Sequence, residues 1–276
     1  MNNQSLTVIE PPRGWQSIGI RELWNFRELL RALLLRDVKI RYKQTILGIA
    51  WAGLQPLVGM VVFTIALNGA AGIPSEAGVP YPIFCYSGLL IWLYFAEALN
   101  RASRSLVTNN LLVTKVYFPR LIAPLSGVIA PVLDFTIAFV ILLGLMVAYG
   151  VGFSWTVLLA PLILIGAILC ATAFGVWLAA LNVEYRDIGY AVPLLVQLWL
   201  FLTPVVYPAS SAHGVLRIIF ALNPMAGVVT VFRWAVLGRG AIDWSIQIPS
   251  LAVLVVVLVA GILYFRRVET SFADSI

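Results

Sequence analysis

Long apolar stretches separated by short polar segments dominate the chain after its first 45 residues. A membrane-spanning helix needs about 20 mostly apolar residues. The pattern therefore predicts an all-α, polytopic membrane protein with six transmembrane helices. The third predicted span is long and contains Pro124 and Pro131, which predict a tilt or kink, and the fifth is short. The spans cover residues 46–70, 83–99, 121–149, 157–182, 192–207 and 248–265.

The segment before the first span has the pattern of an amphipathic helix. Its apolar positions fall on one helical face and its charged positions on the opposite face, as in helices that lie in the membrane interface. The chain thus divides into a polar tail (1–20), an amphipathic cytoplasmic helix (21–45), a six-span domain (46–265) and a cytoplasmic C-terminal tail (266–276). The apolar set is Phe26, Leu29, Leu30 and Leu33; the charged set is Arg27, Glu28 and Arg31.

Residues 209–246 are unusually apolar for an external loop. The runs 214–222 and 225–237 are each too short to cross a membrane, and Asn223-Pro224 between them favours a turn. We expect two short re-entrant helices that dip into the outer leaflet. A pair of helices lying on the surface is the alternative.

Composition and charge support this membrane interpretation. Apolar residues make up 61% of the 276 residues and charged residues 11%, whereas soluble domains carry about 25% charged residues. Fifteen of the 18 Lys and Arg residues fall on the proposed inner side, which predicts that both termini are cytoplasmic. The other three, assigned to outer segments, are Arg217, Arg233 and Arg239. Cys85 and Cys170 lie in apolar runs and are expected to be buried thiols.

Several sequence blocks occur in a characteristic order. The chain resembles permeases of type-2 ABC exporters, in the branch that exports O-antigen, capsule or teichoic-acid polymers. The resemblance covers most of the region from about residue 30 to 265. Its blocks are 36–48 with Trp51 and Gln55-Pro56, then 110–120, 182–188, 203–208 and Asn223-Pro224.

The resemblance implies a homodimer of this chain with two copies of a separate ATPase subunit, in a bacterial inner membrane. The substrate it implies is a polysaccharide linked to undecaprenyl diphosphate. The 276 residues contain no G-x-x-x-x-G-K-[ST] phosphate loop. We therefore expect the partner subunit to bind ATP and magnesium, and this chain to hold no cofactor and no metal.

Basic residues cluster before the first span. One interpretation is a lipid anchor that holds anionic headgroups. The other is a collar of cations that binds the phosphorylated head of the substrate. This basic collar is Arg27, Arg31, Arg36, Lys39, Arg41 and Lys43.

Two predicted cytoplasmic segments are candidates for coupling to the ATPase. A short helix within 103–115 is suited to docking on that subunit, although an ordinary loop is the alternative. Tyr185, Arg186 and Asp187 either form a local ion pair in a tight turn or contact the ATPase or the N-terminal helix. The coupling candidates are Asn109, Asn110, Lys115, Tyr117, Phe118, Arg120, Tyr185, Arg186 and Asp187.

Aromatic residues crowd the second span. Most aromatic residues must serve packing or the interfacial belt, but a sugar chain also passes well along aromatic faces. We predict that part of this set lines a translocation path: Tyr81, Phe84, Tyr86, Trp92, Tyr94 and Phe95.

Ionisable residues give little support to catalysis or proton coupling. Asp134 is the one acidic residue deep in a predicted span, and it is either protonated or paired with another helix. The only His is His213, and no catalytic constellation is visible. The alternatives to polysaccharide export are a type-2 exporter of a small drug or lipid, a membrane enzyme acting on a polyprenyl lipid, and a passive channel.

Overall fold

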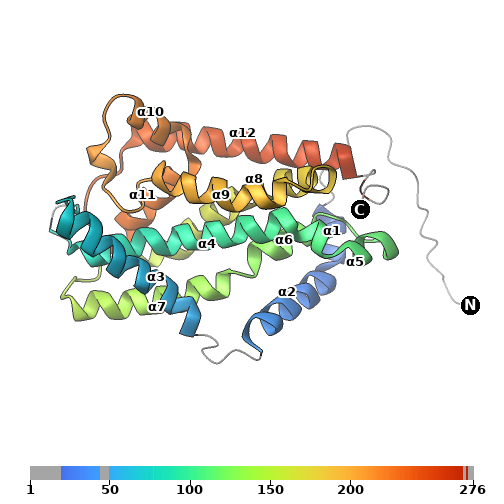
Figure 1. Ribbon diagram of the computed structural model, residues 1–276, viewed down its shortest axis with the longest axis horizontal. Coiled ribbons are helices and arrows are strands. Elements are labelled where there is room, and N and C mark those ends of the chain that lie inside the picture. The colour runs from blue at the N-terminus through green and yellow to red at the C-terminus, as the bar shows by residue number, and fades with distance from the viewer. Residues whose placement is uncertain (1–19, 44–49, 77, 270–271, 273–276) are drawn as a thin grey trace, which may run out of the picture.

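The computed structural model describes residues 20–43, 50–76, 78–269 and 272, and this part of the chain is helical without β-strands (Figure 1). The polar tail 1–19 and the start of the first predicted span, 46–49, lie outside it. The helices are α1 (Ile20–Asn25), α2 (Arg27–Tyr42), α3 (Ala50–Phe63), the π-helix η1 (Thr64–Ala70), α4 (Tyr81–Thr108), α5 (Asn110–Lys115), α6 (Ile122–Ile129), α7 (Val132–Ala148), η2 (Trp155–Leu159), α8 (Ala160–Glu184), α9 (Ile188–Phe201), η3 (Ala209–Ser211), α10 (Val215–Leu222), α11 (Pro224–Leu237) and α12 (Trp244–Val268).

Helix α4 is the central element of the bundle. It packs against α3, α6, α7, α8, α9 and α11, and most of its side chains are buried. Small residues allow the closest contacts: a Cβ on Gly127 would lie 2.8 Å from the Ala102 backbone nitrogen, and one on Gly175 would lie 2.7 Å from the Ala102 Cβ. Both cysteines are free and buried in this core, as expected.

The predicted all-helical membrane architecture is confirmed. Within the described residues, five helical segments are long and apolar enough to cross a membrane, and the bent pair Val215–Leu222 and Pro224–Leu237 would make a sixth if it is one span. The five are Ala50–Ala70, Tyr81–Thr108, Ile122–Ala148, Trp155–Glu184 and Trp244–Val268. The fifth predicted span, 192–207, differs. Its helix α9 has 14 residues and is about 21 Å long, shorter than the ~30 Å hydrocarbon core. Residues 202–208 continue it as turns.

The predicted interruptions occur where the sequence placed them. The third span breaks at Ala130 and Pro131, between α6 and α7. Helices α10 and α11 meet at Asn223 with a bend of 87°. The Asn223 side chain accepts a hydrogen bond from the Met225 amide and so caps α11, and it donates to Leu202 O at 2.9 Å. This asparagine thus joins the bend to the turns that follow α9.

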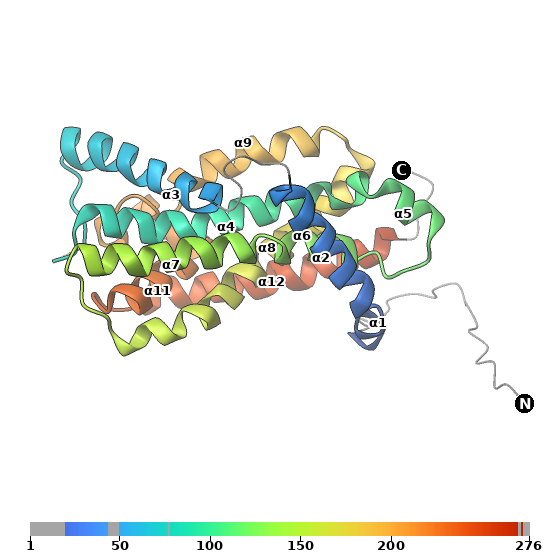
Figure 2. The same ribbon diagram turned by 90° about the horizontal axis from the view of Figure 1, so that it is seen from below.

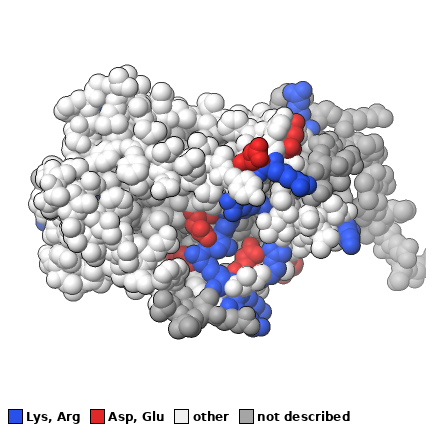
Figure 3. Space-filling view, viewed as in Figure 1, with Lys and Arg blue, Asp and Glu red and all other residues white. Residues whose placement is uncertain are grey.

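Charged residues lie mainly at one end of the molecule. On the face shown in Figure 3 they gather over the half that carries α2, and the other half is almost free of them. Helix α5 and the last turn of α12 lie at the same end, and α10 lies at the opposite end (Figure 1). We call these the charged end and the opposite end.

Candidate functional site

The amphipathic helix α2 packs its apolar face on the protein itself. It lies beside α6, at an angle to the long helices (Figure 2). Leu33 is buried, and the other predicted apolar positions are partly buried on the same cluster, whose core includes Leu106, Phe118, Leu121 and Phe265. Protein therefore covers most of this face, while Leu35 and Ile40 stay exposed.

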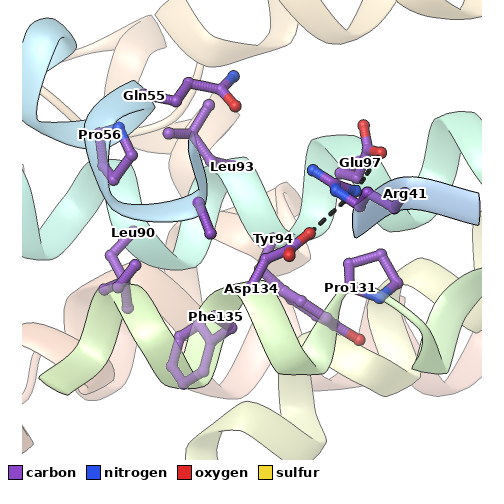
Figure 4. Close-up of a pocket in the computed structure, with 12 residues that line it drawn as sticks. Arg41, Gln55, Pro56, Leu90, Leu93, Tyr94, Glu97, Pro131, Asp134 and Phe135 are labelled. Carbon is purple, nitrogen blue, oxygen red and sulfur yellow. Dashed lines mark hydrogen bonds and ion pairs between the residues drawn. The ribbon is translucent and has the colours of Figure 1, made fainter. Parts of the chain in front are cut away.

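Arg41, near the end of α2, is held by carboxylates from two other helices. Its Nη1 atom lies 2.8 Å from Glu97 Oε1 on α4 and 2.9 Å from Asp134 Oδ2 on α7 (Figure 4). Arg101 Nε lies 2.7 Å from the same Glu97 oxygen. Two cations and two carboxylates therefore form a network without net charge. Of the two alternatives for Asp134, the pairing with another helix is found, and its partner is Arg41 on α2.

Local structure explains why Asp134 serves as the partner. It lies in the first turn of α7, which begins after the break at Pro131. Free amide groups at a helix N-terminus favour a carboxylate. The Tyr42 hydroxyl donates a hydrogen bond to Asp134. Burial, together with this bond to a carboxylate, raises the pKa of Tyr42 to about 12, so the hydroxyl keeps its proton at neutral pH.

An open pocket lies beside Arg41. Arg41, Glu97 and Asp134 lie together in one part of it, and Pro56, Leu90 and Phe135 lie in another (Figure 4). Gln55, Leu93, Tyr94 and Pro131 also line the pocket. The pocket is thus bounded by α2, α3, α4 and α7. A ligand with a charged head and an apolar chain fits such a division.

Arg41 retains hydrogen-bonding capacity toward a ligand. Both of its ion pairs use Nη1, and among the described residues Nε and Nη2 have no protein acceptor. A guanidinium binds phosphate with several N–H groups at once. The two carboxylates orient Arg41, and because each is paired with an arginine, they are unsuited to act as a free acid–base pair.

The other members of the basic collar differ in their freedom. Arg31 pairs with Glu28 at 2.7 Å and Arg36 with Asp37 at 2.9 Å. Arg27 lies over the Trp24 ring and 3.8 Å from Glu28. Within the described part of the chain, Lys39 and Lys43 are exposed and make no ion pair. The unpaired positive charge of the collar is therefore at these two lysines.

All six predicted path-lining aromatics are buried inside the chain's own core. The Tyr81, Tyr86 and Tyr94 hydroxyls donate to the carbonyls of Val206, Ala138 and Val128. The rings pack within the bundle: Phe84, Tyr86 and Phe95 are fully buried, and Trp92 is 2% exposed. A path along these rings requires the surrounding helices to separate, and the path-lining role stays a prediction.

Burial changes the expected outcome of a Trp92 substitution. The ring packs against Phe95 and Trp199, with centroids at 5.4 and 6.4 Å. We expect Trp92→Ala to lower the free energy of unfolding by about 3–5 kcal/mol because it leaves a cavity, measured by thermal unfolding in detergent. Trp155→Ala, at an exposed site, is the control. If Trp92→Ala unfolds at the temperature of the unaltered protein and only export slows, the result favours the path-lining role of Trp92 over a packing role.

A short helix, α5, lies within the predicted segment 103–115, and the coupling candidates near it differ in their exposure. Asn110, Lys115 and Tyr117 are exposed. Asn109 is half-buried and donates back to Ser105 O at 2.7 Å. Phe118 is buried beneath α2. Helix α5 therefore presents a mixed polar and apolar surface at the charged end.

Arg120 is bound by the C-terminal segment. Its backbone amide donates to Glu269 Oε1 at 3.2 Å and its guanidinium donates to Glu269 O. The guanidinium also lies over the Phe272 ring, which is buried against Phe265. The predicted tail 266–276 thus begins inside α12, and its described part packs on the segment that follows α5.

Comparison with known proteins identifies the family. The family model described as ABC-2 type transporter matches residues 28–237, about three quarters of the chain. The chain belongs to the ABC-2 type transporter family. It is 32% identical over 260 residues to the O-antigen export system permease protein RfbA of Myxococcus xanthus, covering 93% of this chain and 98% of that protein.

Two other relatives also match over nearly their whole length. RfbA of Klebsiella pneumoniae, with the same description, is 26% identical over 251 residues, covering 90% of this chain and 94% of that protein. The polysialic acid transport protein KpsM of Escherichia coli is 25% identical over 252 residues, covering 89% and 95%. This ABC-2 chain is therefore a multi-pass membrane protein. All residues that line the pocket beside Arg41 lie within residues 28–237, which the family model matches.

In this ABC-2 chain, Tyr185, Arg186 and Asp187 are all exposed in the turn between α8 and α9. Among the described residues, Arg186 and Asp187 form no ion pair, so the local Arg–Asp pair considered from the sequence is not found. The exposed turn remains available to a partner.

Sequence reasoning missed the role of Arg233. It was assigned to an external segment, but it lies in α11 and is 1% exposed. Its Nη1 donates to Pro204 O at 2.5 Å, its Nη2 donates to Val205 O, and the guanidinium lies 3.7 Å from the centroid of the Phe84 ring. One signal was available: a lone arginine within an apolar helix is buried only at a specific polar site.

Proposed function

We propose that this chain is the permease subunit of an ABC transporter that exports a lipid-linked polysaccharide across the bacterial inner membrane. The observation that carries this proposal is similarity over about nine tenths of the chain to permeases named for two different polysaccharides, O-antigen and polysialic acid. A shared cargo class, rather than one sugar, explains both similarities. The gathering of cations at one end supports a cytoplasmic position for both termini.

The proposed energy source is a separate ATPase subunit. The 276 residues contain no phosphate loop for ATP. The exposed surface of α5 and the turn at 185–187 is the proposed contact with that subunit. The proposed assembly contains two copies of this chain and two ATPase subunits, which bind ATP and magnesium.

The pocket beside Arg41 is the proposed site for the substrate's diphosphate head. The unused N–H groups of Arg41 suit phosphate oxygens, and the apolar wall of Leu90, Leu93 and Phe135 suits the first part of a polyprenyl chain. Lys39, on the same helix as Arg41, and Lys43, directly after that helix, add positive charge two residues before and after Arg41. The glycan then follows a path that opens near the aromatic residues of α4.

Co-purification tests this function. The chain is expressed with a candidate ABC ATPase subunit from the same genome, purified through a tag on the chain, and supplied with undecaprenyl-diphosphate-linked glycan. We expect a one-to-one complex whose ATP turnover rises with the glycan lipid. An exporter of small drugs or lipids would respond to those compounds instead. Turnover of a polyprenyl lipid by the chain alone would indicate an enzyme, and conductance from the chain alone would indicate a channel.

A further inference from the structure

Two exposed segments, far apart in the sequence, lie together at the charged end. One is α5, where the Leu111 side chain is 66% exposed; the other is the turn 184–190, where Tyr190 is 82% exposed. Figures 1 and 2 both place the α8–α9 turn and α5 at this end of the molecule. A partner that binds both segments needs them at a fixed separation.

Arg104 connects α4, which leads into α5, with this turn. Its Nε and Nη2 atoms donate to the Gly189 carbonyl oxygen at 3.1 and 2.6 Å. Asn182, near the end of α8, donates to Ser103 O at 3.0 Å. Two neighbouring residues of α4, Ser103 and Arg104, therefore bind the end of α8 and the start of α9.

The Gly189 carbonyl accepts Arg104 because its own helix offers it no donor. In an α-helix this oxygen would accept from the amide of residue 193. That residue is Pro193, which lies inside α9 and has no N–H. Arg104 thus satisfies a carbonyl that proline leaves free, which fixes the start of α9 relative to α4.

The environment of Gly189 and Arg104 shows that the contact is specific. Gly189 is buried, and a Cβ on it would lie 3.1 Å from Asn182 Oδ1, so a larger residue would require the Asn182 side chain to shift. Among the described residues Arg104 forms no ion pair, although Glu184 and Asp187 lie in the same turn. Arg104 therefore binds a backbone carbonyl of the turn and neither of these two carboxylates.

We propose that Arg104 is a positioning residue that holds α5 and the turn 184–190 as one rigid docking surface for the ATPase subunit. This inference rests on the proposed function. A movement of the ATPase against that surface then shifts α4 and α9 together. Without the contact, the ATPase still binds, but its movement reaches only the segment it touches.

The experiment combines a distance measurement with a coupling measurement on the full chain. Spin labels on Leu111→Cys and Tyr190→Cys report the separation of the two segments by pulsed electron paramagnetic resonance; Cys85 and Cys170 are buried from the label. We expect Arg104→Met to broaden the distance distribution. In the complex it should lower glycan-stimulated ATP turnover about tenfold, with co-purification of the ATPase unchanged.

Two further variants make the test decisive. Arg104→Lys keeps a cationic donor and should restore part of the narrow distribution and of the stimulation. Arg267→Met removes an exposed cation at the same end, outside the contact, and should leave both readouts unchanged. Unchanged distances and stimulation in Arg104→Met would overturn the proposal. Failure of the unaltered chain to bind an ATPase would instead reject the proposed function, and the distance measurement on the purified chain would still test the contact.

Discussion

Replacing Arg41 with Met is expected to raise the concentration of glycan lipid needed for half-maximal ATP turnover by about 10- to 100-fold. This change corresponds to the loss of charge-assisted hydrogen bonds worth about 1.5–3 kcal/mol. The physical reason is that Arg41 holds the only described arginine N–H groups on the pocket wall without a protein acceptor. The measurement is ATP turnover of the purified complex against glycan-lipid concentration.

The same substitution leaves Asp134 without a cation, whereas Glu97 keeps its ion pair with Arg101, so a matched control must remove the charge of Asp134. The double variant Arg41→Met, Asp134→Asn keeps the shapes of the side chains and removes this uncompensated charge. It should recover thermal stability without recovering the response to glycan lipid. Arg41→Lys should respond at intermediate concentrations because it keeps the charge but loses the planar donor geometry. Normal stimulation in the double variant would show that Arg41 only anchors α2.

Replacing Arg233 with Met is expected to lower the free energy of unfolding by about 3–5 kcal/mol, because two buried carbonyls and one aromatic face lose their partner. The affected groups are Pro204 O, Val205 O and the Phe84 ring. Thermal unfolding in detergent measures the change, with a fall in midpoint of about 10 °C for a chain of this size. Arg217→Met is the matched control: Arg217 forms an exposed ion pair with Asp243 at 2.9 Å, and losing such a pair costs at most about 1 kcal/mol.

Gly88 gives a second way to test the same contact. A Cβ on Gly88 would collide with Arg233 Nη2 and Val205 O, so Gly88→Ala should displace the guanidinium and destabilise the protein without removing a charge. If both Arg233→Met and Gly88→Ala unfold at the temperature of the unaltered protein, the buried arginine does not hold the turns 202–208 against α4 and α11.

Local sequence signals predicted the elements well because their causes are local. The apolar face of α2, the interruption at Pro131 and the turn at Asn223-Pro224 each depend on residues within a few positions of one another. The predicted fifth span, 192–207, extends beyond its helix because hydropathy records apolar residues whether or not they are helical. Residues 202–208 form turns, and carbonyls of these turns bind Arg233 and Tyr81.

The sequence by itself determined the membrane class, the order of the helices and the charged end, because hydropathy, proline and charge act through composition and nearest neighbours. Only the tertiary structure decided the pairing of Arg41 with Glu97 and Asp134, the burial of Arg233, the inward position of the α4 aromatics and the contact of Arg104 with Gly189. Each of these joins residues on different helices. Their partners depend on how the helices pack. Burying a charged group costs free energy, and where a side chain distant in the sequence offsets that cost, no periodic pattern along the chain reveals it.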